Sequence, residues 1–179
     1  MRAVVRLATA AVVVAAAALA GCAAPASKQA MTVDKQTTVG KQHPNSVAVT
    51  TTCGADTSAL GSSNIGNAEL KGAIEASIRE TRVFREVVQG AGGQYELVVN
   101  VISLSKPSMG FSFTVDMEAG WTLTRVSDRQ VVLRKAITST FTATMSAAFA
   151  GAERLRLAVE GAAKANIAQG LAAIGQLDL

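Results

Sequence analysis

The longest regular alternation of apolar and polar residues runs from Phe111 to Thr124. Its apolar positions recur at every second residue: Phe111, Phe113, Val115, Met117, Ala119, Trp121 and Leu123. Because successive side chains of a strand point to opposite faces of a sheet, this pattern predicts a long antiparallel strand with one buried and one solvated face. Trp121 belongs to the buried face, which favours a place in the core over a role in ligand binding.

The residues after this strand predict a hairpin. Ser127 and Asp128 are typical of a tight turn, and residues 129–144 predict the returning strand. Lys135 falls on the face of that strand that is otherwise apolar, with Val131, Leu133, Ile137 and Phe141. A bulge or an edge position would accommodate this charge.

Shorter alternations predict two further strands, over residues 46–53 and 94–105. Between them, Asn67 is a candidate N-cap for a helix that runs from Ala68 to about Arg82. One face of this helix is apolar except for Ser77: Leu70, Ala73, Ile74, Ser77 and Ile78. A long helix is predicted within residues 147–175, where Leu155, Val159, Ala163, Ile167 and Leu171 recur at every fourth position. The predicted fold is α+β with the order β-α-β-β-β-α, an antiparallel sheet with two helices packed on one face.

Residues 1–21 have the features of a secretory signal peptide. Arg2 and Arg6 flank the start of a short apolar run that is too short to span a membrane. The run ends in Leu19-Ala20-Gly21-Cys22, which resembles the lipobox of bacterial lipoproteins at all four positions. This resemblance implies cleavage before Cys22 and attachment of acyl chains, palmitate among them, to its thiol and new amino group. Several chains on one residue are enough for stable anchoring in a membrane.

The residues after Cys22 predict location and domain organisation. Ala23 follows the cysteine, whereas lipoproteins kept in the inner membrane commonly carry Asp there, so the resemblance implies the periplasmic face of the outer membrane. Residues 22–45 then comprise the lipidated cysteine and a polar segment without an apolar period, which predicts a flexible tether of roughly 25–30 Å. Residues 46–179 are predicted to form a single periplasmic α+β domain.

Removal of the signal peptide changes the charge balance. The whole chain has 17 basic and 13 acidic residues and a net charge of +4. Without Arg2 and Arg6 the net charge falls to about +2. The chain has no run of Lys and Arg, and an exported lipoprotein would not meet nucleic acid, so we expect no nucleic-acid partner.

Cys53 is the only thiol left once Cys22 is acylated, so no internal disulfide is expected. The pattern around it favours a buried strand cysteine over an intermolecular or reactive thiol.

Few residues offer catalytic chemistry. His43 is the only histidine, and the polar pattern places it in the tether. A Ser-His-Asp arrangement, a Cys-His pair and a multi-histidine metal site therefore have no candidate. The glycine-rich residues 90–93 lead into a strand rather than a helix, which favours a hairpin-type turn over a phosphate-binding loop.

Asp116 and Glu118 point to the same face of the long strand, so they are a candidate acid/base pair or weak cation site. Arg134 on the returning strand is a candidate ion-pair partner. A solvated strand face explains these charges more simply. The sequence therefore predicts that the protein is not an enzyme and uses no metal and no cofactor.

The lipobox, the polar segment, "ELKGAIEASI" after the first strand, "YELVVNV" and the Ala-rich closing helix together resemble small outer-membrane lipoproteins of proteobacteria. These include the auxiliary lipoproteins of ABC-type lipid transporters and the lipopolysaccharide-assembly lipoprotein. The resemblance implies a non-catalytic, lipid-anchored auxiliary or docking component of an outer-membrane transport or assembly complex, with an envelope protein as partner. The alternative is a periplasmic lipid- or glycolipid-binding protein. A filled core favours the first function and a concave apolar cavity favours the second.

The lipid-anchor prediction is tested by Cys22→Ser. Because the acyl chains are attached to Cys22, this variant is expected to move from the membrane fraction to the soluble periplasmic fraction. Retention of the variant in the membrane fraction, at the level of the unaltered protein, would contradict a lipid anchor.

Overall fold

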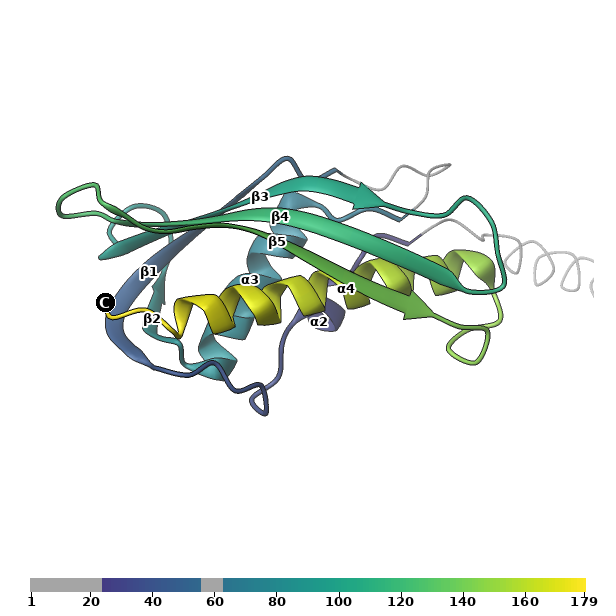
Figure 1. Cartoon of the computed structure of the whole chain (residues 1–179), viewed down its shortest axis with the longest axis horizontal. Coiled ribbons are helices and arrows are strands. Elements are labelled where there is room, and N and C mark those ends of the chain that lie inside the picture. The colour runs from purple at the N-terminus through teal and green to yellow at the C-terminus, as the bar shows by residue number, and fades with distance from the viewer. Residues whose placement is uncertain (1–23, 56–62) are drawn as a thin grey trace, which may run out of the picture.

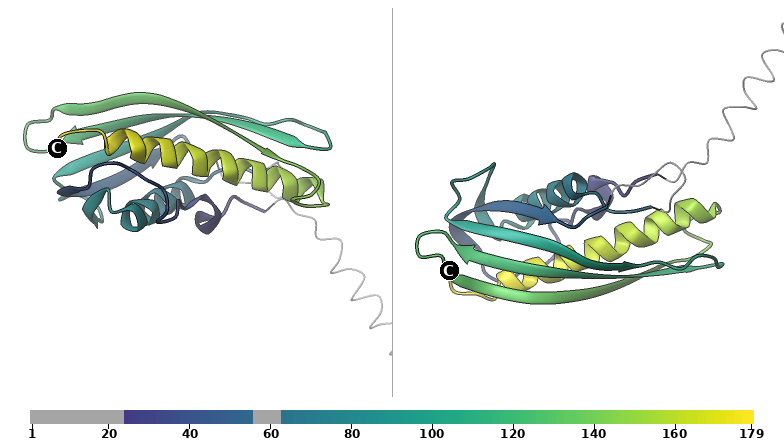
Figure 2. Two further views of the ribbon diagram at one scale, coloured as in Figure 1. Left: turned by 60° about the horizontal axis from the view of Figure 1, so that its bottom comes forward. Right: turned by 90° about the horizontal axis from the view of Figure 1, so that it is seen from above.

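Helices cover one face of a five-stranded sheet in this computed structural model, which describes residues 24–55 and 63–179 (Figures 1 and 2). The signal peptide and Cys22 lie outside the described residues. The strands are β1 (His43–Thr52), β2 (Phe84–Val88), β3 (Tyr95–Ser105), β4 (Phe113–Arg125) and β5 (Val131–Ala143). The helices are α2 (Lys28–Met31), α3 (Asn67–Thr81) and α4 (Gly151–Ile174).

The sheet is mixed, so the prediction of a wholly antiparallel sheet is wrong. Its strand order is β2-β1-β3-β4-β5. β1 pairs in parallel with both β2 and β3, and only β3, β4 and β5 pair antiparallel. The prediction failed because it missed β2, a strand of five residues directly after α3. α3 carries the chain back to the start of the sheet, so the next strand runs in the same direction as β1.

The loop between β2 and β3 passes across β1. β2 ends opposite Ala48, and β3 begins opposite Val47 on the other side of the same strand. At Gly93 the crossing is so close that a Cβ atom would lie 2.7 Å from the Ala48 backbone nitrogen. The glycine-rich turn predicted at residues 90–93 therefore exists, but it joins two strands that flank β1 instead of closing a hairpin.

The β4–β5 hairpin and the closing helix agree with the prediction. Trp121 is buried in the core, and its Nε1 donates a hydrogen bond of 2.9 Å to Asn166 Oδ1 of α4. The amide nitrogen of Asn166 donates in turn to the Ile137 carbonyl oxygen of β5, at 2.8 Å. This buried pair of hydrogen bonds fixes α4 across both strands.

Two glycines bring α4 close to the sheet. A Cβ atom at Gly170 would lie 2.5 Å from the Trp121 ring, and one at Gly161 would lie 2.3 Å from the Phe141 ring. Glycine inside a helix costs about 1 kcal/mol relative to alanine, so the contact with the two rings accounts for its presence here.

Residues 24–42 are packed onto the domain, so the prediction of a flexible tether is wrong for the described part of this segment. Ala26, Met31, Val33 and Val39 are buried in the core. The Val33 backbone N–H donates to Ser77 Oγ of α3 at 2.9 Å, which explains the one polar residue on the buried face of that helix. The prediction failed because four apolar residues spaced irregularly give no helical or strand period.

Among the described residues, none of the helices is both long enough and apolar enough to cross a membrane.

Substitution of Gly170 tests the close helix–sheet contact. Gly170→Ala is expected to lower the free energy of unfolding by about 1–3 kcal/mol, because the added methyl group overlaps a rigid buried ring. Gly72→Ala is the matched control within a helix. There the nearest atoms belong to the flexible Lys28 side chain, so it is expected to be neutral or stabilising by up to about 1 kcal/mol. Urea denaturation measures both values, and equal effects of the two variants would contradict the contact.

Candidate functional site

Cys53 is exposed and not disulfide-bonded, so the interpretation as a buried strand cysteine is wrong. β1 ends at Thr52, and Cys53 follows in the left-handed conformation with φ of 60°. The chain leaves the sheet at this residue, which turns the thiol away from the core.

His43 belongs to the folded domain, contrary to the prediction. It is the first residue of β1, is buried, and its Nε2 lies 3.0 Å from the Ile174 carbonyl oxygen at the end of α4. Its ring also packs against Phe84, with 5.6 Å between the ring centroids. These contacts support a structural role. Among the described residues, no group of three or more His, Cys, Asp and Glu side chains could hold a metal ion.

Asp116 and Glu118 lie on the solvent-facing side of β4. Thr140 Oγ1 donates a hydrogen bond to Asp116 Oδ1, and Glu118 lies opposite Thr138 of β5. Arg134 is paired with Thr122 and makes no ion pair with either carboxylate among the described residues. The structure therefore does not bring these three charges together.

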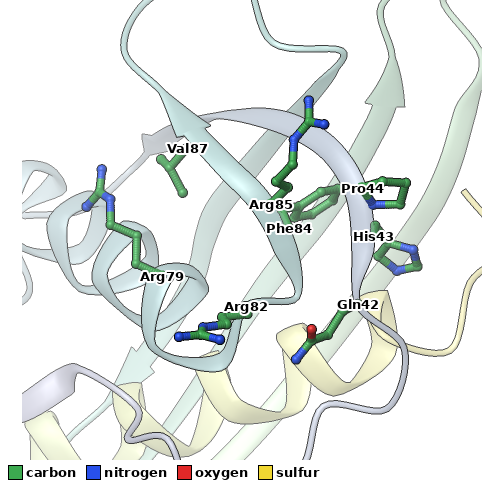
Figure 3. A pocket seen from close by; sticks show the side chains of 8 residues that line it. All are labelled: Gln42, His43, Pro44, Arg79, Arg82, Phe84, Arg85 and Val87. Carbon is green, nitrogen blue, oxygen red and sulfur yellow. The ribbon is translucent and has the colours of Figure 1, made fainter.

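A hollow of about 480 Å³ lies beside β2 and is lined by three arginines, Arg79, Arg82 and Arg85 (Figure 3). The guanidinium groups point in different directions, and Arg79 is paired with Glu75 of the same helix at 3.5 Å. One small anion cannot contact all three groups in this arrangement.

A second hollow, of about 390 Å³, has mostly apolar walls, and we call it the α2–α4 groove. One wall is the segment around α2, another is α4, and Phe141 of β5 closes one side. The lining residues are Ala30, Val33, Thr37, Phe141, Leu157, Glu160, Gly161, Lys164, Ala165 and Ala168. The Phe141 ring rests on Gly161 and is partly exposed, so it forms part of the wall without filling the groove.

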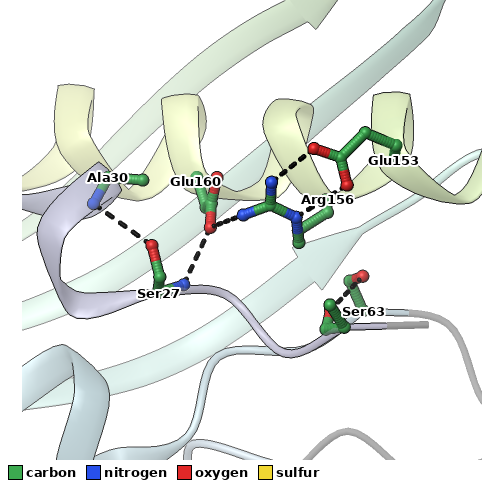
Figure 4. A network of polar contacts seen from close by, with 7 residues as sticks. Ser27, Ala30, Ser63, Glu153, Arg156 and Glu160 are labelled. Carbon is green, nitrogen blue, oxygen red and sulfur yellow. Dashed lines mark hydrogen bonds and ion pairs between the residues drawn. The ribbon is translucent and has the colours of Figure 1, made fainter. Parts of the chain in front are cut away.

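Glu160 is the buried charge in this groove. Its Oε1 accepts hydrogen bonds from the Ser27 backbone N–H at 2.8 Å and from Arg156 Nη1 at 2.6 Å (Figure 4). Its Oε2 is also buried but has no hydrogen-bond partner among the described residues. A carboxylate oxygen buried without a donor is costly, so a ligand that supplies an N–H group would stabilise this site.

Arg156 links Glu160 to the more exposed Glu153 (Figure 4). The hydrogen bond from Arg156 lowers the pKa of the Glu153 carboxyl. The same bond raises the pKa of Arg156, and the charge of Glu160 adds to this effect. At the rim of the groove, Lys164 Nζ lies 3.2 Å from Asp34 Oδ2. Apolar walls with a charged rim are typical of a protein-binding surface.

β5 forms the edge of the sheet next to the groove. Lys135 lies opposite Trp121 and is exposed on this edge strand, so of the two predicted alternatives, a bulge or an edge position, it occupies an edge position. A charge on the inward-facing side of an edge strand discourages pairing with other chains. Residues 137–143, beyond Lys135, are the part of the edge that remains suited to strand addition.

Sequence reasoning did not identify Glu160 or Lys164 as site residues. Arg156, Glu160 and Lys164 are spaced four residues apart, which is typical of charges on an exposed helix face. Nothing local shows that the segment around Ser27 covers Glu160. The one local signal was Gly161, next to Glu160, because a glycine inside a helix indicates that another part of the chain packs closely there.

The fold is shared with proteins from bacteria, although no family model and no curated protein sequence matches the chain. Protein XCC0632 of Xanthomonas campestris, of the family DUF330, has a TM-score of 0.56 and 11% identity over 78% of this chain and 87% of that one. The hypothetical protein CT253 of Chlamydia trachomatis has a TM-score of 0.54 and 6% identity over 74% and 96%. A minor lipoprotein of Acinetobacter baumannii gives 0.43 and 8% identity over 74% and 93%, a likeness that supports no conclusion about this chain.

The likenesses to XCC0632 and CT253 show that the fold is shared, and they show nothing further about this chain. The descriptions of these proteins name neither a transporter auxiliary nor a lipopolysaccharide-assembly lipoprotein, so those assignments stay predictions.

The role of Glu160 in holding the N-terminal segment is tested by Glu160→Ala. Loss of the acceptor for the Ser27 N–H is expected to speed amide hydrogen exchange over residues 24–33 by about tenfold. Glu153→Ala is the matched control, since it removes the other carboxylate on Arg156 but touches no residue of the segment. Equal exchange in the two variants would show that Glu160 does not hold the segment.

Proposed function

We propose that this protein is a non-catalytic, lipid-anchored component of the bacterial envelope that docks onto a protein partner. The lipobox at Cys22 supports the anchor, and Ala23 supports the periplasmic face of the outer membrane. The partner belongs to a transport or assembly complex, as the resemblance of the sequence to auxiliary lipoproteins implies.

The α2–α4 groove is the observation that carries the docking function. Its walls are apolar, but they include Glu160, whose buried Oε2 lacks a hydrogen-bond donor in the described part of the chain. An acyl chain could fill the apolar part but has no N–H group to offer this oxygen. A polypeptide supplies both apolar side chains and donors, from its backbone or from Lys and Arg. This combination favours a polypeptide over a bare acyl chain in the groove.

The packing between α4 and the sheet favours the same choice. A lipid-binding protein of this architecture would need a cavity between its helices and its sheet. Ala158, Ala162, Ala163 and Ile167 are buried there, and Gly170 leaves no room for even a methyl group beside Trp121. Small residues of α4 thus serve close packing and make no space for an acyl chain.

Edge-strand pairing offers the geometry for docking. An extended segment of the partner added to β5 along residues 137–143 would form backbone hydrogen bonds with the edge. Phe141 lies in this stretch and also lines the groove, so a side chain of the added strand could enter the groove beside it.

Site-specific photo-crosslinking in cells tests the docking surface. A photoreactive residue at Ala168 in the groove is expected to give one protein adduct. The control position is Arg85, on β2 at the opposite edge of the sheet, where no such adduct is expected. Glu160→Gln keeps an acceptor for the Ser27 N–H but removes the charge. Phe141→Ser removes the aromatic ring from the groove wall. Each is expected to lower the adduct yield by about tenfold.

Native mass spectrometry of the soluble Cys22→Ser protein decides the alternative. Retention of one phospholipid or glycolipid, together with an adduct yield at Ala168 that Glu160→Gln leaves unchanged, would overturn docking in favour of lipid binding.

A further inference from the structure

Four large apolar side chains are exposed at one end of the molecule, and we call this the apolar end. Met109 and Phe111 lie in the β3–β4 loop and are 82% and 81% exposed. Met145 and Phe149 lie in the β5–α4 loop and are 47% and 90% exposed. Single exposed apolar residues are common, but four gathered at one end mark a surface that contacts something apolar.

The two loops lie side by side at this end (Figure 1). They begin next to each other, because Phe113 of β4 pairs with Ala143 of β5. Arg154 holds the second loop in place: its Nη1 donates to the carbonyl oxygens of Ala148 at 2.9 Å and Phe149 at 2.6 Å. Its guanidinium group also lies 5.4 Å from the centre of the Phe113 ring. The exposed position of Phe149 is thus supported by a buried side chain, because Arg154 itself is buried.

The described chain begins beside the same end. Lys106, which follows β3 and starts the first loop, donates from Nζ to the Ser63 carbonyl oxygen at 3.0 Å. Ser63 Oγ donates to the Ala24 carbonyl oxygen at 2.8 Å, and the Ala26 N–H donates to the Asn64 carbonyl oxygen at 3.2 Å. Cys22 is two residues before Ala24, and two residues span at most about 7 Å.

The near absence of charged residues in the two loops favours a lipid bilayer as the surface that the apolar end contacts. Residues 106–112 and 144–150 contain no Asp and no Glu, and Lys106 is their only charged residue. The turn at the other end of the β4–β5 hairpin is different, since Asp128 and Arg129 lie there. Apolar side chains without carboxylates can enter the boundary between headgroups and acyl chains of an anionic bilayer.

We infer that the apolar end inserts into the membrane interface next to the acylated Cys22, so that the loops and the acyl chains anchor the protein together. This inference rests on the proposed lipid anchor. α4 begins at the apolar end and runs along the long axis of the molecule (Figures 1 and 2). Its 24 residues would carry the chain about 36 Å away from the bilayer. The α2–α4 groove, on the middle half of α4 from Leu157 to Ala168, would then face the periplasm.

Nitroxide labels on the lipidated protein test this orientation. The protein, with Cys53→Ser, is reconstituted into vesicles of phosphatidylethanolamine and phosphatidylglycerol, and one cysteine is placed at Met109, Phe149 or Asp128. Labels at 109 and 149 are expected to collide with lipid-dissolved oxygen rather than with a water-soluble nickel chelate. The ratio of the two collision rates is expected to exceed that at 128 by about tenfold. Acylated Cys22 has no free thiol and is not labelled.

Paired variants test whether the aromatic side chains cause the insertion. With the label at Met145, Phe111→Ser with Phe149→Ser is expected to shift it into water. Val126→Ser with Val131→Ser is the matched control, because these partly exposed residues flank the turn at the opposite end of the hairpin. It is expected to leave the label in lipid.

Two results would overturn the inference. Labels at 109 and 149 as open to the nickel chelate as the label at 128 would show that the end faces water. Strong dipolar broadening between labels at 109 of two copies, without contact with lipid, would show that the end is an interface between copies. A failed anchor gives a different result, because the unaltered protein would then lack acyl mass and would not float with the vesicles.

Discussion

The contact between Trp121 of β4 and Gly170 of α4 sets the distance between the helix and the sheet, and the rest of the structure depends on that distance. Asn166 accepts the indole N–H and so allows a polar group to be buried at the same place. Because α4 lies this close, Phe141 rests against Gly161 at the edge of the sheet and stays partly exposed. The space beside it becomes the α2–α4 groove instead of a cavity inside the core.

The N-terminal segment, residues 24–42, is packed against the domain and does not form a flexible tether. Met31 and Val33 fill the space between α3 and α4. Hydrogen bonds from the backbone of this segment to the side chains of Ser77 and Glu160 fix its position. Only Ala23 separates Cys22 from Ala24, the first described residue of this packed segment, whereas a tether would leave the domain free to rotate. In the proposed lipid-anchored state, so short a connection would restrict which end of the domain meets the bilayer. The proposed insertion of the apolar end follows from this restriction.

Glu160 contacts both the N-terminal segment, residues 24–42, and the groove. One oxygen of its carboxylate holds the Ser27 backbone and Arg156, and the other is buried without a partner among the described residues. A buried carboxylate with one oxygen unpaired lowers the stability of the fold, because the desolvation cost of that oxygen is not offset by a hydrogen bond. The docking proposal gives this oxygen a role, and the other oxygen of the same carboxylate holds the Ser27 backbone.

Local patterns alone determined β4, β5, α3, α4 and the burial of Trp121, because the periods of strands and helices depend only on neighbouring residues. The resemblance of residues 19–22 to a lipobox is local in the same sense. The parallel strand β2, the buried His43 and the packed segment before it depend on contacts between residues far apart in the chain, which leave no period in the sequence. The site shows the same division: the spacing of Glu160 between Arg156 and Lys164 indicates an exposed ion-pair row. Only the tertiary structure, by laying Ser27 over this helix turn, decided that the carboxylate is buried in an apolar groove.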